Sequence, residues 1–515
     1  MAEAAIPVLI EQMLQPGFYS HPVKEPIKLI QTHVSYVFLT GDYVYKVKKP
    51  MNFGFLDYSS LEKRQHFCNE ELRLNQRGAA ELYLEVLPIV LIGDNYHLGG
   101  SGEAAEYALK MKQFPEEGLL STLFADGKLT EARIEELGKV VAEYHATKTE
   151  TNDYILSFGE IPKVRESIDQ NYEQTDKYIG IVQTKEQFED TKKYTDNFFA
   201  GRQELFKSRI DKNFIRECHG DLHLGNICLW EDNIRLFDCI EFNEPFRFVD
   251  VMYDVAFTVM DLEARGRKDL ANIFLNTYLE QTGDWEGLQV LPLYLSRQAY
   301  VRAKVNSFIF DDPGVPEDAK ENIAKSAVGY YKQAWEYTKS QQGRLILMSG
   351  LSGSGKSTTA RYLARKLGAI QIRSDAVRKH LGGVGLLEKG GEELYSAEMT
   401  NKTYSRLLEL GIILAKQGYT VILDGKYDRV SLRSVVIEKA QASQIPLQIV
   451  SCEAPVEILR KRLIERTGDI ADATAGLLTS QQASAEAFTE TEKSYVKVLD
   501  TTQSLDTQLD GLISL

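Results

Sequence analysis

The sequence predicts two domains of different fold class, an α+β domain followed by an α/β domain with a parallel sheet. Residues 27–48 alternate β-branched or aromatic residues with polar ones on both sides of Gly41-Asp42, a pattern typical of antiparallel strands joined by a hairpin. Beyond residue 343, apolar strand-like segments alternate with helical ones, which favours a parallel sheet. The short polar segment 339–343 separates the two patterns. We therefore expect one domain at residues 1–340 and another at 341–515.

The composition is that of a globular protein. The chain has 515 residues, 43% of them hydrophobic and 26% charged, and its net charge of -14 disfavours non-specific binding to nucleic acid or to anionic membranes. The 5 cysteines include no CxxC pair, so we expect reduced thiols rather than disulfides or a structural zinc site. Neither a signal peptide nor a long apolar span is visible, which predicts a cytoplasmic protein that does not enter a membrane.

The first part is predicted to begin with strands and to continue mainly as helices. Ser59-Ser60-Leu61-Glu62 resembles a capping box and predicts a helix that runs to about Gln76. The remaining expected elements of this part are strands at 27–40, 43–48, 83–93, 96–98 and 107–113, helices through 130–215, a strand–turn–strand passage at 214–241, and helices to about residue 339.

The second part is predicted to alternate strictly between strands and helices. We expect strands at 345–349, 369–373, 420–424 and 447–452, and helices at 356–367, about 393–417, 429–442 and 455–466.

A glycine-rich turn links the first strand and first helix of the second part. The residues Gly350-Leu-Ser-Gly-Ser-Gly-Lys-Ser357 have the spacing of a P-loop, in which glycines let backbone N–H groups surround a phosphate chain. In that motif Lys356 reaches the β- and γ-phosphates and Ser357 binds Mg²⁺. The nucleotide-binding residues predicted here are Gly350, Gly353, Ser354, Gly355, Lys356, Ser357 and Thr358.

Charged residues follow the next strands of this part. Asp375 comes directly after the second strand and Asp424 ends the third, so both are expected at the edge of the sheet where ligands bind. Asp375 is a candidate acceptor of a substrate proton, with helix capping as the alternative, and Asp424 is a candidate Mg²⁺ group. Arg462 and Arg466 share a helix face and are candidate phosphate-binding lid residues, with surface charge as the alternative.

A second constellation lies in the first part, at His219-Gly-Asp-Leu-His-Leu-Gly-Asn226. The spacing between Asp221 and Asn226 is that of a kinase catalytic loop, in which the Asp orients an attacking hydroxyl and the Asn binds Mg²⁺. Twelve residues on, after a predicted hairpin, Asp238 is expected to return to the same metal. Lys46, on a predicted strand, is the candidate phosphate-binding lysine. Either Glu70 or Glu71 could pair with it, and we favour Glu71.

The second part resembles small P-loop kinases of the gluconate kinase, polynucleotide kinase and zeta toxin group, over about residues 344–500. The resemblance rests on the P-loop, the Asp after the second strand and the later arginines. It implies that Asp375 holds or deprotonates the acceptor and that Arg462 and Arg466 close over the phosphates.

The first part resembles the aminoglycoside phosphotransferase family, whose fold is a reduced relative of the protein kinases, over most of residues 25–340. The shared features are Lys46, the 219–226 loop, Phe237-Asp238, and an acidic pair, Asp250 and Asp254, placed in the following helix. His-Gly-Asp favours the small-molecule branch over protein kinases. The nucleotide-covering turn would involve residues 32–35, where His33 and Ser35 are either phosphate contacts or structural.

The whole chain resembles a bacterial family described as bifunctional aminoglycoside phosphotransferase-like and ATP-binding proteins. The phrases that carry this resemblance are at residues 32–39, 45–50 and 55–57. It implies an ATP- and Mg²⁺-dependent kinase with two sites and small-molecule acceptors. The near-neutral charge of residues 344–515 disfavours nucleic acid as a substrate. The alternatives are a toxin-like or regulatory kinase, in which the first part controls a P-loop half acting on a nucleotide sugar or a nucleic-acid end, and a non-catalytic ATP-sensing scaffold.

Overall fold

A computed structural model describes residues 8–508 of the chain. All 5 cysteines are buried, and none of them is in a disulfide bond. Among the described helices, none is long and apolar enough to cross a membrane.

The chain divides into two compact units, each made of three separate stretches of sequence. The first unit consists of 1–133, 143–177 and 196–261, and the second of 134–142, 178–195 and 262–515. The dividing lines pass through three helices, α4 (Glu131–Glu143), α7 (Lys185–Gly201) and α10 (Val251–Ala264). The boundary at residues 340 and 341 stays a prediction. Residues 262–339 belong to the same compact unit as the P-loop part.

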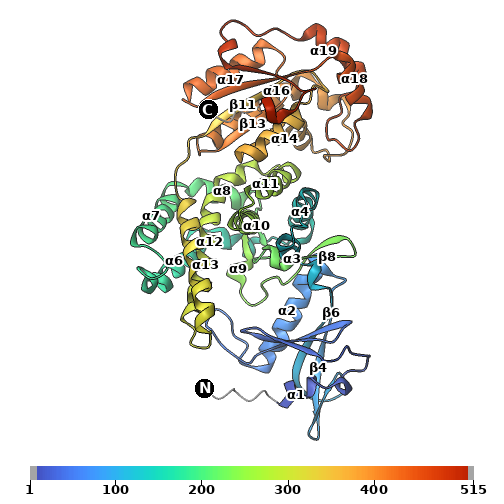
Figure 1. Cartoon of the computed structure of the whole chain (residues 1–515), viewed down its shortest axis with the longest axis vertical. Helices are drawn as coiled ribbons and strands as arrows, with labels where there is room; N and C mark the ends of the chain where they lie inside the picture. Colours follow the sequence, from blue (N-terminus) through green and yellow to red (C-terminus); the bar gives the residue numbers. More distant parts are fainter. Residues whose placement is uncertain (1–7, 509–515) are drawn as a thin grey trace. The chain divides into compact units, whose positions relative to one another are not determined.

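The first unit contains a six-stranded antiparallel sheet in the order β1-β2-β3-β6-β4-β5, drawn in blue in Figure 1. Its strands are β1 (Lys28–Gln31), β2 (Ser35–Leu39), β3 (Tyr43–Lys48), β4 (Tyr83–Ile92), β5 (Asn95–Leu98) and β6 (Ala104–Lys112). The single strand expected at 27–40 is therefore two strands. The Thr32 hydroxyl accepts hydrogen bonds from the N–H groups of Val34 and Ser35, and this local turn interrupts the extended backbone.

Helix α2 (Leu61–Ala79) lies between β3 and β4 in the chain and contacts β4, β6 and β9. Its N-cap is Ser60, whose hydroxyl accepts from the N–H of Lys63, so the helix begins one residue later than the capping-box pattern of Ser59 and Glu62 predicts. It also runs one turn past the expected end at Gln76. The buried face of α2 carries Glu71 and Asn75 toward the interior.

Short strands and helices complete the first unit. They are α1 (Val8–Met13), α3 (Leu120–Ala125), α5 (Asp153–Leu156), α6 (Ile161–Thr175), α8 (Gln203–Asp211), β7 (Ile215–Glu217), β8 (Ile227–Trp230), β9 (Asn233–Leu236), α9 (Glu244–Arg247) and β10 (Phe248–Asp250). Strands β8 and β9 form the hairpin expected between Asn226 and Asp238. Asp250 ends strand β10 rather than lying in the following helix, and its carboxylate pairs with the buried Arg209.

The second unit contains a five-stranded parallel sheet in the order β12-β13-β11-β14-β15. Its strands are β11 (Arg344–Ser349), β12 (Ile370–Arg373), β13 (Thr420–Asp424), β14 (Leu447–Glu453) and β15 (Val496–Asp500). Four of them lie within a residue of the predicted positions, and β15 has no predicted counterpart. Figure 1 shows the sheet surrounded by helices drawn in orange and red.

The helices of the second unit alternate with these strands and precede them. They are α11 (Lys268–Thr282), α12 (Leu291–Asp311), α13 (Glu317–Glu336), α14 (Lys356–Leu367), α15 (Ser374–Gly382), α16 (Ala397–Ala415), α17 (Val430–Ala442), α18 (Val456–Glu465) and α19 (Leu478–Ser484). Apolar residues of β11, β13, β14 and α14 form a buried cluster between sheet and helix. This packing fixes the turn between β11 and α14, where the P-loop lies.

Candidate active sites

The first candidate site is built on the loop 219–226, which joins β7 to β8. The Asn226 side-chain amide donates to the Asp221 carboxylate (Nδ2–Oδ2, 2.9 Å) and to the Asp221 carbonyl oxygen (3.0 Å). Gly220 has a φ of 86°, and a Cβ there would lie 2.6 Å from the carbonyl oxygen of Phe246, so the turn requires glycine. The loop thus brings Asp221 and Asn226 together.

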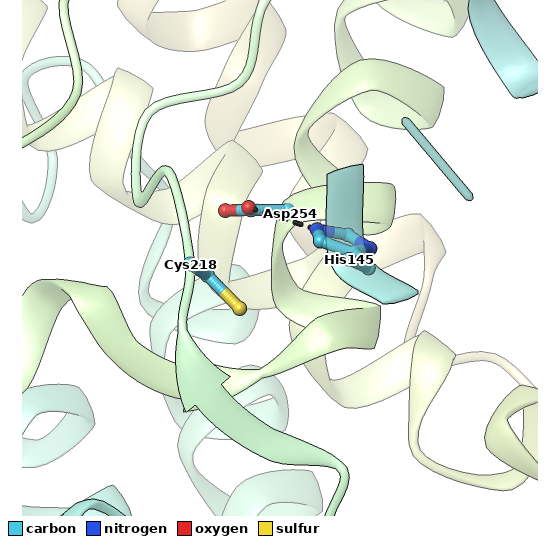
Figure 2. A group of neighbouring side chains, drawn as sticks. All are labelled: His145, Cys218 and Asp254. Carbon is cyan, nitrogen blue, oxygen red and sulfur yellow. Dashed lines mark hydrogen bonds and ion pairs between the residues drawn. The ribbon is translucent and has the colours of Figure 1, made fainter. Parts of the chain in front are cut away.

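A buried carboxylate from α10 holds this loop in place (Figure 2). Asp254 accepts hydrogen bonds from the N–H groups of His219 and Gly220, both at 2.8 Å, and His145 Nε2 lies 3.1 Å from the same carboxylate. With Cys218, His145 and Asp254 form a group whose candidate ligand atoms all lie within 4.8 Å. Because the two Asp254 oxygens accept these backbone hydrogen bonds, Asp254 supports the conformation of the loop.

Lys46 lies between the two carboxylates that the sequence associates with it. Its Nζ is 2.7 Å from Glu71 Oε1 and 3.0 Å from Asp238 Oδ1, and only 18% of its side chain is exposed. Of the two glutamates left open, Glu71 makes this contact, whereas Glu70 pairs with Arg73 on the helix surface. Burial alone would raise the pKa of Glu71, but Lys46 and a second lysine, Lys48, outweigh it and hold that pKa below its ordinary value.

The hairpin β8–β9 returns Asp238 to the loop 219–226. The N–H of Phe237 donates to the carbonyl oxygen of Asn226 at 3.0 Å, and Asp238 follows with a φ of 62°. Its side chain is 46% exposed. Carboxylate and amide oxygens are the donors that Mg²⁺ prefers, so Asp238 and Asn226 form a donor set that fits this ion.

A second buried lysine near Lys46 is a residue that the sequence reasoning missed. Lys48 Nζ contacts Glu71 Oε2 at 2.6 Å and Glu241 Oε1 at 2.5 Å, and the Tyr58 hydroxyl donates to the same Glu241 oxygen. The side chains of Lys48 and Glu71 are each only 1% exposed. Lys48 follows Lys46 on the same face of β3, and this period-two spacing is the only signal that could have predicted it.

The turn at the start of β2 contains His33 and Ser35, which the sequence left open as phosphate contacts or structural residues. Ser35 is fully buried and His33 is exposed. In this conformation the buried Ser35 hydroxyl cannot contact a phosphate. The structure therefore favours the structural interpretation of Ser35.

The second candidate site begins with the P-loop, whose glycines adopt conformations that other residues avoid. The φ angles are 137° at Gly350, 80° at Gly353 and 91° at Gly355. A Cβ would lie 2.5 Å from the Cys452 carbonyl oxygen at Gly350 and 2.7 Å from that of Leu459 at Gly353. The loop can therefore pack against the backbone of β14 and α18 only because these positions lack side chains.

A cavity of about 710 Å³ lies at this loop. Of the predicted nucleotide-binding residues, Gly353, Gly355, Lys356, Ser357 and Thr358 line it, whereas Gly350 and Ser354 do not. Lys356 Nζ donates to the Leu351 carbonyl oxygen at 2.8 Å, and burial lowers its pKa, an effect that nearby Asp424 partly offsets.

The two predicted carboxylates reach the same cavity. Arg373 and Asp424 are register partners at the ends of β12 and β13, and Asp375 lies in the first turn of α15. The N-cap of α15 is Arg373, so Asp375 does not cap the helix. Burial raises the pKa of Asp375, and Arg373 partly offsets this effect.

The predicted lid arginines both line the cavity, each held by backbone oxygens. Arg462 donates to the carbonyl oxygen of Thr501 at 2.7 Å and to its hydroxyl at 2.9 Å. Arg466 follows α18 and donates to the carbonyl oxygen of Ala471 at 2.9 Å. These contacts hold both guanidinium groups on segments beside the P-loop.

Other cavity residues were not predicted. Arg373, Asp469 and the rings of Tyr395 and Tyr404 all line the cavity. Arg373 could have been found from its place at a strand end, but the other three lie in irregular or helical segments with no motif. The glycine conformations, Lys356 and the carboxylate at the end of β13 together fit an Mg²⁺-bound nucleotide.

Comparison with known proteins places the whole chain in a family. It is 32% identical, over 90% of this chain and 91% of the other, to the protein named "Uncharacterized protein Rv2004c" of Mycobacterium tuberculosis (strain ATCC 25618 / H37Rv). The chain therefore belongs to the family of that protein. Residues 345–488 match a family described as "AAA domain". A shikimate kinase of Paracidovorax citrulli (strain AAC00-1) is 35% identical over 98 residues, 18% of this chain and 53% of that protein.

Solved structures resemble each part separately. A choline/ethanolamine kinase family protein from Mesorhizobium loti covers 64% of this chain and 97% of its own, with a TM-score of 0.38 and 8% identity. A sugar kinase from Janibacter sp. HTCC2649 covers 33% and 93%, with a TM-score of 0.26 and 23% identity. The fold class is taken from the order of the strands in the two main sheets. The predicted fold class is confirmed as an antiparallel-sheet α+β domain followed by a parallel-sheet α/β P-loop domain. The predicted resemblance of the second part to P-loop kinases agrees with its matches to the AAA domain family and to shikimate kinase.

Proposed function

We propose that the chain is an ATP-dependent phosphotransferase with two sites, each transferring the γ-phosphate of ATP to a hydroxyl group of a small molecule. One observation carries this proposal. Each part brings together a lysine for phosphate, a buried or loop-held aspartate for the acceptor, and oxygen donors suited to Mg²⁺. A non-catalytic scaffold would not need all three elements in both parts.

In the first site, Asp221 orients the acceptor hydroxyl and accepts its proton. The acceptor oxygen forms a bond to the γ-phosphorus, the bond from that phosphorus to the β–γ bridging oxygen breaks, and ADP leaves. Lys46, held by Glu71, neutralises phosphate charge. Asn226 and Asp238 would hold Mg²⁺, which supplies charge neutralisation at the phosphates.

In the second site, the P-loop N–H groups and Lys356 bind the phosphates, and Ser357 and Asp424 would hold Mg²⁺, Asp424 through water. Asp375 accepts the proton of the acceptor hydroxyl. Its raised pKa suits a proton acceptor, because the conjugate acid then forms with a smaller penalty. Arg462 and Arg466 neutralise charge on the transferred group.

The test is transfer of γ-labelled phosphate from ATP into a size-fractionated cell extract. Wild type is compared with Asp221→Asn and with Lys356→Ala. We expect two labelled small molecules, each variant abolishing one of them. The controls make the same substitutions at exposed positions of the same units: Asp211→Asn on α8 and Lys366→Ala on α14. Both controls should leave both products unchanged.

Two outcomes contradict the proposal. If label enters only protein or nucleic acid, the regulatory or toxin-like alternative replaces it. If Asp221→Asn changes no product while Lys356→Ala does, the first part controls the second and does not itself transfer phosphate.

A further inference from the structure

Helix α11 lies outside the matched residues 345–488, yet it is bound to the P-loop sheet within the second unit. Within the described residues, β12 is an edge strand of the parallel sheet and pairs with β13. Asn276 closes its free edge, because its side-chain oxygen accepts from the N–H of Gln371 at 2.7 Å and its amide donates to the Ala369 carbonyl at 3.0 Å. Asn272 donates to the same carbonyl at 2.9 Å. These hydrogen bonds fix α11 in one register along β12.

One helical turn beyond Asn276, the same helix delivers a carboxylate to the end of β12. Glu280 Oε2 lies 3.6 Å from Arg373 Nη1, and the Glu280 carbonyl oxygen pairs with His380 Nε2 at 2.8 Å. Glu280 is therefore held at both its backbone and its side chain. Its position follows directly from the register that Asn276 sets.

Arg373 connects Glu280 to the cavity. Only 6% of its side chain is exposed. Its Nη2 donates to Asp469 at 2.6 Å, and its Nε lies 3.9 Å from Asp424 Oδ2. One buried guanidinium thus lies within 4 Å of three carboxylates. Asp424 and Asp469 line the cavity, and Glu280 does not.

The charges of this group are interdependent. With Glu280 ionised, Arg373 is shared among three carboxylates. If Glu280 were neutral, Arg373 would interact more strongly with Asp424, the carboxylate that would hold Mg²⁺. Burial raises the pKa of Glu280, and Arg373 is the main group that opposes this effect.

We infer that Glu280 is a positioning residue of the P-loop site. It draws Arg373 away from Asp424 and so leaves Asp424 available to Mg²⁺, which means that the working P-loop kinase includes α11 and begins well before residue 345. This inference rests on the proposed function of the same cavity, and it adds a residue that lies outside the sequence of the P-loop part.

The test measures Mg²⁺-dependent binding of ADP to the full chain by calorimetry. The part of the ADP binding that Lys356→Ala abolishes is the part assigned to the P-loop site. In Glu280→Gln, we expect the Mg²⁺ concentration needed for half-maximal tightening of ADP binding to rise about tenfold, as is common for partners behind a metal ligand. ADP binding without Mg²⁺ should not change, which a merely structural role would not predict.

Glu286→Gln is the matched control. Glu286 lies in the same region and pairs with Arg406 at 3.3 Å, away from the cavity. It should leave the Mg²⁺ dependence unchanged. Glu280→Asp keeps the charge and should give a smaller shift, and it decides the matter if Glu280→Gln does not fold.

If Glu280→Gln folds and has the Mg²⁺ dependence of wild type, the inference is wrong, but the proposed function stands. If Glu280→Gln does not fold, the same result in Glu280→Asp has the same meaning. An equal shift in Glu280→Gln and Glu286→Gln also overturns it, since the effect would then be a general loosening. If wild type has no ADP-binding component that depends on Lys356, the proposed function itself is wrong and the inference falls with it.

Discussion

At the scale of residues, the lysines of β3 have distinct roles that their similar sequence contexts do not reveal. Lys46 is partly exposed and contacts Asp238, whereas Lys48 is buried between Glu71 and Glu241. Because Glu71 accepts from both, Lys48 helps to fix the carboxylate that positions Lys46. The buried group Lys48, Glu71, Glu241 and Tyr58 connects the strand, the helix α2 and the segment that follows Asp238.

Lys48→Met should destabilise the first unit strongly. Removing one partner from a buried ion pair leaves uncompensated charge and costs about 3–5 kcal/mol. The measurement is amide hydrogen exchange in β3 and α2. Lys63→Met removes an exposed ion pair with Asp57 and should have a much smaller effect, because solvent screens such a pair. A Lys48→Met effect no larger than that of Lys63→Met would contradict the assigned role.

The same variant should show a pH dependence of known sign. The lysines hold the pKa of Glu71 below its ordinary value of 4.5. A carboxyl group with a lowered folded-state pKa stabilises the fold above the unfolded pKa and loses that contribution as the pH falls through the folded pKa. The difference between wild type and Lys48→Met should therefore shrink below pH of about 4.5.

At the scale of elements, α2 packs against β9 so closely that one position of the helix must be glycine. A Cβ at Gly78 would lie 2.5 Å from the Leu236 carbonyl oxygen. The strand β9 leads directly to Asp238, so this contact also sets the distance between α2, which carries Glu71, and the predicted metal ligand.

Gly78→Ala should destabilise the first unit although alanine favours helices. The steric overlap with backbone outweighs the gain of about 1 kcal/mol in helix propensity. Gly329→Ala, on the exposed face of α13 with no atom within 4 Å of the new Cβ, should stabilise the second unit by about 0.5–1 kcal/mol. Urea unfolding of both variants measures the two signs, and stabilisation by Gly78→Ala would refute the packing argument.

At the scale of the whole molecule, the contacts of α11 bear on where the P-loop part begins. A fragment of residues 341–515 exposes the free edge of β12, whereas a fragment of residues 262–515 keeps Asn272 and Asn276 on it. Unpaired backbone groups on an edge strand cost stability and favour association.

We expect the 262–515 fragment to melt several degrees above the 341–515 fragment. The shorter fragment lacks the hydrogen bonds of Asn272 and Asn276, and each lost hydrogen bond costs about 1 kcal/mol, enough to lower the melting temperature by a few degrees. Differential scanning calorimetry measures this difference. Asn276→Ala in the longer fragment should remove part of it. Equal melting temperatures would support the boundary at residues 340 and 341.

Much of the candidate chemistry could be predicted because it lies in short segments of the chain. The spacing of Asp221 and Asn226, the P-loop from Gly350 to Ser357 and the carboxylate at Asp424 are local patterns whose geometry follows from one turn and its flanking strands. The choice between Glu70 and Glu71 could not be made in this way, because adjacent helix residues differ only in which one faces the sheet, and packing decides that.

The sequence by itself determined the two fold classes and the order of the motifs, because hydrophobic periodicity and glycine-rich turns depend on near neighbours. Only the tertiary structure decided that Lys48 is buried with Glu241, that Asp254 holds the loop 219–226, and that Glu280 reaches Arg373. The Lys48–Glu241 and Glu280–Arg373 pairs each join residues more than 90 positions apart. Asp254 and His219 are 35 positions apart. Such contacts depend on how whole elements pack, and no local pattern in the chain encodes that packing.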